Sequence, residues 1–197
     1  MKILVTGGNG EFCKHLVRVG KEHSFITPHK QGMYPGLDVR DYWNVDYYFR
    51  KRENDFDYVI HAGAVTRPMV IHEDNPTLSI KTNIVGTANV VMACEKYKKK
   101  IIYISTDYVY DGISGNFKET DCMKPFTKYG WSKLGGECAV QMYDNHLILR
   151  MAMKEESTCF KNSWSEVLLS VICMYLIILV PVGTVIYLLP IVVSDVA

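Results

Sequence analysis

Five short apolar runs, separated by segments long enough for helices, limit most strongly how this chain can fold. The runs are rich in Val, Ile and Tyr and cover residues 3–5, 25–26, 58–60, 101–104 and 147–149. Short continuous runs of this kind are typical of strands whose two faces are both covered. Strands that alternate with helices imply right-handed crossovers, so the pattern predicts an α/β fold with a doubly wound parallel sheet.

The segment between the third and fourth runs carries clear helix signals. Asn75 and Pro76 supply an N-cap and a first-turn proline, and three lysines at 98–100 lie near the negative end of the helix dipole. Apolar positions recur between these ends at helical spacing, at Ile80, Ile84, Ala88 and Val91. We expect a helix of about five turns here.

The first predicted strand runs directly into a glycine-rich turn, Gly7-Gly8-Asn9-Gly10. A glycine cluster can serve packing alone, but its place in the first strand–turn–helix unit favours a Rossmann-type domain that binds a dinucleotide pyrophosphate. Two residues depart from the usual pattern. Cys13 stands at the third glycine position, and Glu11 brings a carboxylate near the phosphates, so its side chain must point to solvent if the cofactor binds.

Three further segments bear on the cofactor. Asp38-Val39 follow the second strand where a carboxylate can accept from the adenine amino group and an aliphatic side chain can cover the ring, although Asp38 could equally be a turn residue. The second strand ends in Thr27-Pro28, with Lys30 close by and no acid for a ribose hydroxyl, which favours NADP(H) over NAD(H). The third strand ends in Ala62-Gly63-Ala64, small residues that suit either a cofactor or close packing.

The fourth strand ends in Ser105-Thr106-Asp107-Tyr108, and Tyr129 and Lys133 follow on a predicted helix. A spacing of four places both side chains on one helix face, so we expect the Lys133 ammonium to lower the pKa of the Tyr129 phenol. Such a phenol can protonate a carbonyl oxygen that receives a hydride. Tyr47 and Lys51 have the same spacing but follow no Ser-Thr strand end, so they serve as an internal comparison.

These motifs, together with Thr82–Asn89, resemble the extended short-chain dehydrogenases/reductases and, among them, the dTDP-4-dehydrorhamnose reductases, over residues 1 to about 153. The resemblance implies that Thr106 hydrogen-bonds the keto oxygen, Tyr129 protonates it and Lys133 holds the nicotinamide ribose. It places Asp107 beside the sugar and leaves open whether Asn83 is catalytic or structural. It implies a cofactor site lined by Gly7, Gly10, Glu11, Phe12, Asp38, Val39, Ala62, Gly63 and Ala64, with Tyr129 and Lys133.

The resemblance implies reduction of a nucleotide-linked 4-keto-6-deoxy sugar. Related dehydratases carry an Asp-Glu pair after the Thr, whereas this chain has Asp107-Tyr108, so reduction is favoured over dehydration. A sugar-nucleotide epimerase or dehydratase stays an alternative. A second hypothesis is a dinucleotide-binding regulatory module that performs no catalysis, because the regulatory subunit of methionine adenosyltransferase resembles the same reductases. A third is an inactive fragment.

The C-terminal part differs in character from the rest. We expect residues 1–153 to form the NAD(P)-binding domain and 154–166 a linker, with the family's substrate domain missing. No residue from 167 to 193 is charged, and about 20 apolar residues can span a bilayer, so this segment is a candidate membrane helix. Pro181 and Pro190 interrupt it. A buried helix and strand of the same domain, or a non-native end, are the alternatives.

Composition excludes several other classes. The 22 Lys and Arg residues balance 21 Asp and Glu residues, so no basic excess favours nucleic acid. The six cysteines form no C-x-x-C pair or zinc-like spacing, so we expect no metal site and reduced thiols. The first strand begins at the N-terminus and leaves no room for a signal peptide. We therefore expect a cytoplasmic protein, anchored to a membrane only if residues 167–193 insert.

Overall fold

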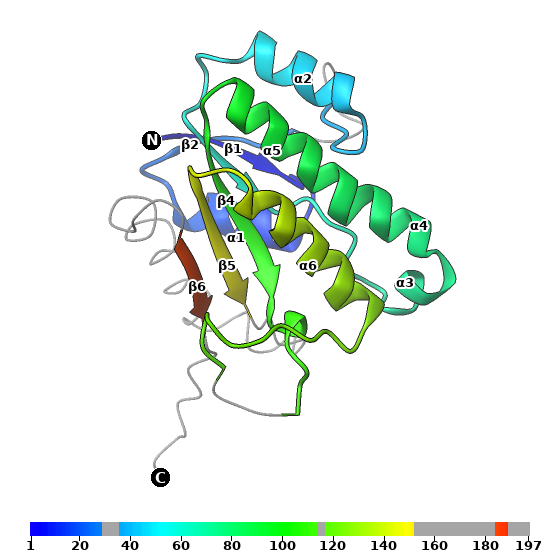
Figure 1. The fold of residues 1–197 in the computed structure, drawn as a ribbon. Coiled ribbons are helices and arrows are strands. Elements are labelled where there is room, and N and C mark those ends of the chain that lie inside the picture. The colour runs from blue at the N-terminus through cyan, green and yellow to red at the C-terminus, as the bar shows by residue number, and fades with distance from the viewer. Residues whose placement is uncertain (29–35, 114–116, 152–183, 189–197) are drawn as a thin grey trace.

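The computed structural model describes residues 1–28, 36–113, 117–151 and 184–188, which form one parallel sheet flanked by helices (Figure 1). The strands lie in the order β2-β1-β3-β4-β5-β6. Their bounds are β1 Lys2–Thr6, β2 Ser24–Ile26, β3 Tyr58–His61, β4 Lys100–Thr106, β5 His146–Met151 and β6 Thr184–Leu188. All five apolar runs lie within strands, which confirms the predicted doubly wound sheet.

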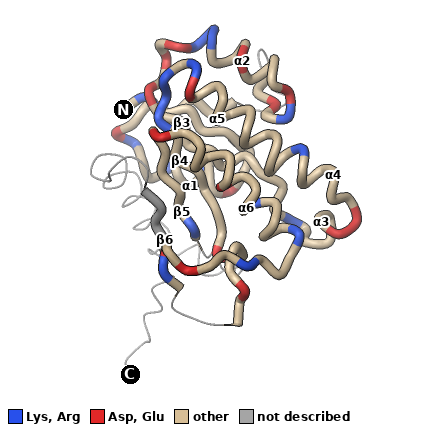
Figure 2. Tube along the Cα trace, viewed as in Figure 1, with Lys and Arg blue, Asp and Glu red and all other residues tan. Residues whose placement is uncertain are grey.

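The helices connect these strands and cover both faces of the sheet. Their bounds are α1 Glu11–Val19, α2 Tyr42–Lys51, α3 Val70–Asp74, α4 Pro76–Ser79, η1 Ile80–Val85, α5 Gly86–Lys96, η2 Asp107–Val109 and α6 Lys128–Gln141. In Figure 1, α1 lies behind the sheet, and α2, α5 and α6 lie in front of it. Figure 2 shows acidic and basic residues next to one another around α2 and around α3.

Side chains alternate between two apolar layers because successive strand residues point to opposite faces of the sheet. One layer contains Leu4, Val59, Ile101, Tyr103 and Ile148 with residues of α2, α5 and α6. The other contains Ile3, Val5, Ile60, Ile102 and Leu149 with Cys13 and Leu16 of α1. Burial on both faces explains why the strands read as continuous apolar runs.

The predicted helix after Asn75 forms, but its centre is not an α-helix. Asn75 caps α4 by accepting from the backbone N–H of Leu78 at 3.1 Å. Residues 80–85 then form a π-helical turn, and Ile80 is 49% exposed. The i→i+5 bonds of a π turn rotate one helix face relative to the next. The expected apolar stripe is therefore wrong at Ile80, and the polar residues Asn83 and Thr87 are buried instead.

Part of the uncharged C-terminal segment belongs to the sheet. Thr184–Leu188 form β6, which pairs in parallel with β5 from Leu147 to Met151. The expected membrane helix over 167–193 is therefore wrong for residues 184–188. No helix among the described residues is long and apolar enough to cross a bilayer. The linker 154–166 and the rest of 167–193 lie outside the described residues.

Candidate cofactor and active site

A topological switch point lies between β1 and β3, because the chain passes from β1 to β2 on one side and then to β3 on the other. Ligands of doubly wound sheets bind at such a point, beyond the carboxyl ends of the strands. Gly7 follows β1 there with a φ of +78°. A Cβ on Gly7 would lie 2.9 Å from the Cα of Gly63, which follows β3. Only glycine at position 7 permits both this φ and this approach.

The N-terminus of α1 faces the same switch point. Gly10 is its N-cap and donates its backbone N–H to the Gly7 carbonyl at 2.8 Å, and no side chain caps the helix. The Glu11 side chain is 74% exposed and pairs with Lys14, so it points to solvent as the cofactor hypothesis requires. Phe12 is half-buried, and Cys13 is buried against the sheet. Backbone N–H groups at a helix N-terminus form an anion site of the kind a pyrophosphate needs.

The two side chains expected to contact adenine, Asp38 and Val39, both have partners within the protein. The Asp38 carboxylate accepts two hydrogen bonds from the Arg40 guanidinium, at 2.9 and 2.7 Å. Val39 is buried in the apolar layer, where a Cβ on Gly86 would lie 2.8 Å from its Cγ2. Ala62, Gly63 and Ala64 are half-buried at the tip of β3. Lys30 lies outside the described residues.

Thr106 and Tyr129 come together although they belong to different elements. Thr127 caps α6 by accepting from the Gly130 N–H at 3.0 Å. A Cβ on Gly130 would overlap the carbonyl oxygen of Tyr108, so glycine lets α6 approach the loop after β4. The Thr106 hydroxyl lies within hydrogen-bonding reach of two groups, the Tyr129 phenol and the Asp107 carboxylate, the latter at 3.0 Å. Threonine, aspartate and tyrosine thus form one cluster at the carboxyl end of β4.

The surroundings of Tyr129 favour its protonated form. Burial raises the pKa of Tyr129 to about 12, although the hydrogen bond from Thr106 acts in the opposite direction. Two rings lie against the phenol: His72 at 5.0 Å and Tyr108 at 5.9 Å between ring centroids. Tyr129 is therefore a protonated donor over the whole neutral range.

Lys133 contradicts the expectation drawn from its spacing. Its amine is buried, donates to the Ile104 carbonyl at 2.8 Å and lies 4.1 Å from the centre of the Tyr103 ring. Burial lowers the pKa of Lys133 to about 7, with Glu137 opposing this shift. The prediction that Lys133 lowers the pKa of Tyr129 is wrong, because the amine points into the sheet and burial of the phenol dominates.

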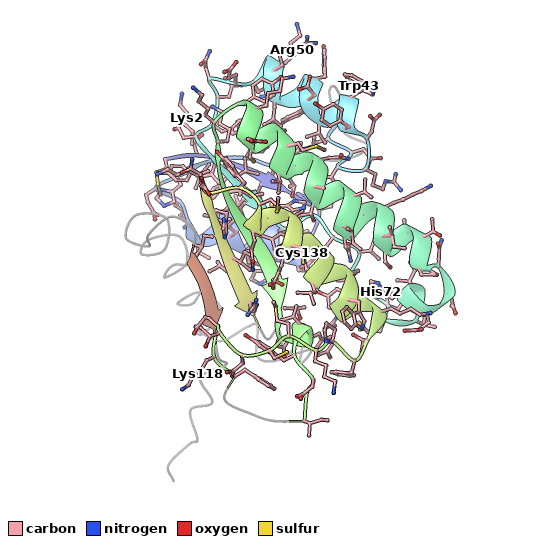
Figure 3. All side chains as sticks on the ribbon, in the orientation of Figure 1. Lys2, Trp43, Arg50, His72, Lys118 and Cys138 are labelled. Carbon is pink, nitrogen blue, oxygen red and sulfur yellow. The ribbon has the colours of Figure 1, made fainter. Side chains whose placement is uncertain are left out.

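Sequence reasoning missed one neighbour of Tyr129 and did not settle the role of another polar residue. His72 is buried, and its ring bonds the Ser79 hydroxyl at 2.7 Å and the Thr66 carbonyl at 3.3 Å. Figure 3 shows His72 near the start of α6, whereas Cys138 lies near the other end of this helix. No periodicity or motif marks His72, because its position depends on the short helix α3.

Asn83 acts as a brace in this structure. Its side-chain amide accepts from the Val65 N–H at 2.8 Å and donates to the Val65 carbonyl at 2.9 Å. It also donates to the Ser132 hydroxyl at 2.9 Å. Asn83 therefore ties the π-helical turn to the loop after β3 and to α6, which is a structural role.

The comparison pair lies elsewhere. Tyr47 and Lys51 belong to α2, with the Lys51 amine 5.8 Å from the Tyr47 ring centre. Figure 1 places α2 at the opposite end of the molecule from α3 and the start of α6. Tyr47 has neither the threonine nor the strand tip that accompany Tyr129.

A family model describes the same residues that build this site. Residues 1–155 match the model of the RmlD substrate binding domain. The chain belongs to the RmlD family. Methionine adenosyltransferase 2 subunit beta of Xenopus laevis is 35% identical over 94 residues, 47% of this chain and 28% of that protein. The probable low-salt glycan biosynthesis reductase Agl14 of Haloferax volcanii is 33% identical over 167 residues, 77% of this chain and 53% of that protein.

A solved structure agrees with the fold of this RmlD-family chain. The dTDP-4-dehydrorhamnose reductase of Bacillus anthracis, in complex with NADP, is 26% identical and superimposes with a TM-score of 0.68. The match covers 77% of this chain and 54% of that reductase. The chain thus spans between about a quarter and about a half of the length of these relatives.

Proposed function

We propose that this RmlD-family chain takes part in the NADPH-dependent reduction of a nucleotide-linked 4-keto-6-deoxy sugar. The observation that carries the proposal is the cluster of Thr106, Asp107 and protonated Tyr129 at the carboxyl end of β4. The glycine turn follows the carboxyl end of β1 in the same parallel sheet. The reductases among its relatives support the reaction class. The full activity also requires sugar binding, which residues 1–151 alone do not explain.

The residues at the switch point fit a dinucleotide. Gly7 lets the turn after β1 pack directly against Gly63 after β3, and the uncapped N-terminus of α1 supplies N–H groups for a pyrophosphate. The absence of an acid at Thr27-Pro28 and the presence of Lys30 favour a 2′-phosphate, and the Bacillus anthracis reductase holds NADP. When bound, NADPH supplies the hydride.

The chain's own residues have separable roles. Thr106 orients the keto oxygen toward Tyr129, and the phenol donates its proton to the oxyanion that develops there. Lys133 holds the nicotinamide ribose, for which its amine must leave the Ile104 carbonyl. Asp107 lies beside the sugar. Tyr108 stands where a dehydratase needs a second carboxyl group, so the site lacks the base for elimination.

Replacing Tyr129 with Phe tests the proposal. The variant removes the proton donor and keeps the ring between His72 and Tyr108, so the rate of NADPH oxidation should fall by about 10²–10⁴-fold at unchanged NADPH affinity. The measurement is single-turnover oxidation of NADPH with dTDP-4-dehydrorhamnose, where chemistry limits the rate. Tyr47→Phe is the matched control and should leave the rate unchanged. A Tyr129→Phe rate above about a tenth of the original would refute the assignment.

The 35% identity to methionine adenosyltransferase 2 subunit beta favours a second candidate, a regulatory module that binds a dinucleotide without turnover. In that case the unaltered chain binds NADPH but oxidises none of it with the sugar nucleotide. Tyr129→Phe then changes neither binding nor any rate. The same titration and turnover experiment therefore separates the two functions.

A further inference from the structure

A buried histidine stands at the centre of a chain of hydrogen bonds beneath the switch point. His61, the last residue of β3, is 1% exposed. The Gly63 N–H donates to the Thr6 hydroxyl at 3.0 Å, and this hydroxyl lies 2.6 Å from Nδ1 of His61. On the other side, Nε2 of His61 lies 3.0 Å from the Thr87 hydroxyl, which donates to the Asn83 carbonyl at 2.7 Å.

The Asn83 carbonyl fixes the direction of these hydrogen bonds, because a carbonyl can only accept. The Thr87 hydroxyl gives its one proton to Asn83, so it accepts from Nε2 of His61, which must carry a proton. A ring with a single proton then accepts at Nδ1, so the Thr6 hydroxyl donates to it. Burial lowers the pKa of His61 to about 3, and the nearby Lys133 charge acts in the same direction. The ring is thus neutral, with a single tautomer.

Each end of this series of hydrogen bonds reaches a residue that the proposed function uses. Thr6 directly precedes Gly7, and Gly63 packs against Gly7 so closely that a Cβ on Gly7 would lie 2.9 Å from its Cα. Asn83 continues through Ser132, whose hydroxyl donates to the Tyr129 carbonyl at 2.7 Å.

The ring itself points toward Lys133. His61 stacks on Tyr103 with 5.6 Å between ring centroids, and the Lys133 amine lies over Tyr103. These are the titratable groups that face His61, and neither accepts a proton from it. His61 therefore contacts Thr6, next to the glycine turn, and Tyr103, which lies under the Lys133 amine. Its role is thus to position other residues.

We infer that His61 is a positioning residue for the glycine turn that would bind the cofactor: by accepting from Thr6 it holds the Gly63 backbone against Gly7. An apolar residue would pack equally well here, as Ile60 does in the opposite layer, but it would leave the Thr6 hydroxyl without an acceptor. The inference rests on the dinucleotide-binding part of the proposed function and not on sugar reduction.

The test compares two replacements of His61 in the full chain. His61→Gln keeps one acceptor and one donor, whereas His61→Phe keeps a ring and removes both. NADPH affinity, followed by nicotinamide fluorescence, should stay within about threefold for His61→Gln and weaken about tenfold or more for His61→Phe. Thr6→Val breaks the same contact from the other side and should match His61→Phe. His146→Phe, at a buried histidine that starts the strand β5, is the control and should bind NADPH normally.

A spectroscopic measurement on the ligand-free protein separates positioning from simple packing. With 15N-labelled histidine, the His61 ring, assigned by its loss in His61→Gln, should carry its proton on Nε2 and stay neutral from pH 5 to 8. A proton on Nδ1, or an imidazolium in this range, overturns the inference.

The binding results are equally decisive. Unchanged NADPH affinity in a folded His61→Phe or Thr6→Val variant overturns the inference and leaves the proposed function standing. If His61→Phe does not fold, the inference is judged on the other two variants. NADPH affinity should then weaken in Thr6→Val and be kept in His61→Gln. If the unaltered chain binds no NADPH, both the inference and the cofactor proposal fall. Binding without sugar reduction overturns only the reduction.

Discussion

Replacing Glu137 with Gln should destabilise the protein far more than replacing a surface charge. Glu137 of α6 and Arg150 of β5 form an ion pair whose side chains are 0% and 1% exposed, with 2.7 Å between Oε2 and the guanidinium. Ser105 donates to the same carboxylate. Arg150 also donates to the Tyr110 hydroxyl at 2.7 Å and to the Glu119 carbonyl at 3.2 Å. The pair therefore ties the segment between Thr106 and Tyr129 to the sheet.

The size of the effect follows from burial. Glutamine still accepts from Ser105, but it leaves the Arg150 charge uncompensated and turns an amide N–H group toward the guanidinium. Breaking a buried pair in this way costs about 3–5 kcal/mol, and a whole domain is stable by only about 5–15 kcal/mol. We therefore expect Glu137→Gln to remove a large share of the free energy of unfolding, measured by urea titration.

Two controls make this prediction refutable. Lys128→Gln breaks the ion pair with Glu73, which has a similar N–O distance of 2.8 Å but side chains 51% and 56% exposed, and should cost only about 0.2–1 kcal/mol. The double variant Glu137→Leu with Arg150→Met removes both buried charges and should be more stable than Glu137→Gln. If Glu137→Gln costs no more than Lys128→Gln, the reasoning from burial is wrong.

Two further predictions concern Lys133 and the cofactor. Since burial lowers the pKa of Lys133 from 10.5 to about 7, the unfolded chain binds more protons than the folded one between these values, so folding stability rises with pH there. Lys133→Met should therefore be most stabilising below pH 7 and progressively less so toward pH 10 in urea titrations; a constant difference would contradict this. NADPH should bind at least as tightly as NADH in a fluorescence titration, and NADH binding tenfold tighter, about 1.4 kcal/mol, would contradict the inference from Lys30.

The strands and their tips were predictable because their signals are local. Val, Ile and Tyr in short runs identify β1 and β3–β5. Gly7 directly follows β1 in the sequence, and Thr106 is the last residue of β4. The π-helical turn was not predictable. Asn83, at its centre, bonds Val65 and Ser132, which lie 18 and 49 residues away in the chain. Only the assembled fold brings these partners together, so hydrophobic periodicity around Ile80 could not reveal the turn.

Helical spacing places Tyr129 and Lys133 on one helix face but predicts the wrong electrostatics, and the difference bears on the protonation state of the proposed proton donor. A spacing of four fixes where two side chains begin, not where they end. Here the amine ends at the Ile104 carbonyl, and the phenol ends beside Thr106. A lowered phenol pKa would make Tyr129 a base at neutral pH, as the oxidation of an alcohol needs. With a pKa of about 12, Tyr129 keeps its proton until a more basic alkoxide forms next to it. Burial of the phenol therefore keeps Tyr129 in the donor form that the proposed ketone reduction requires.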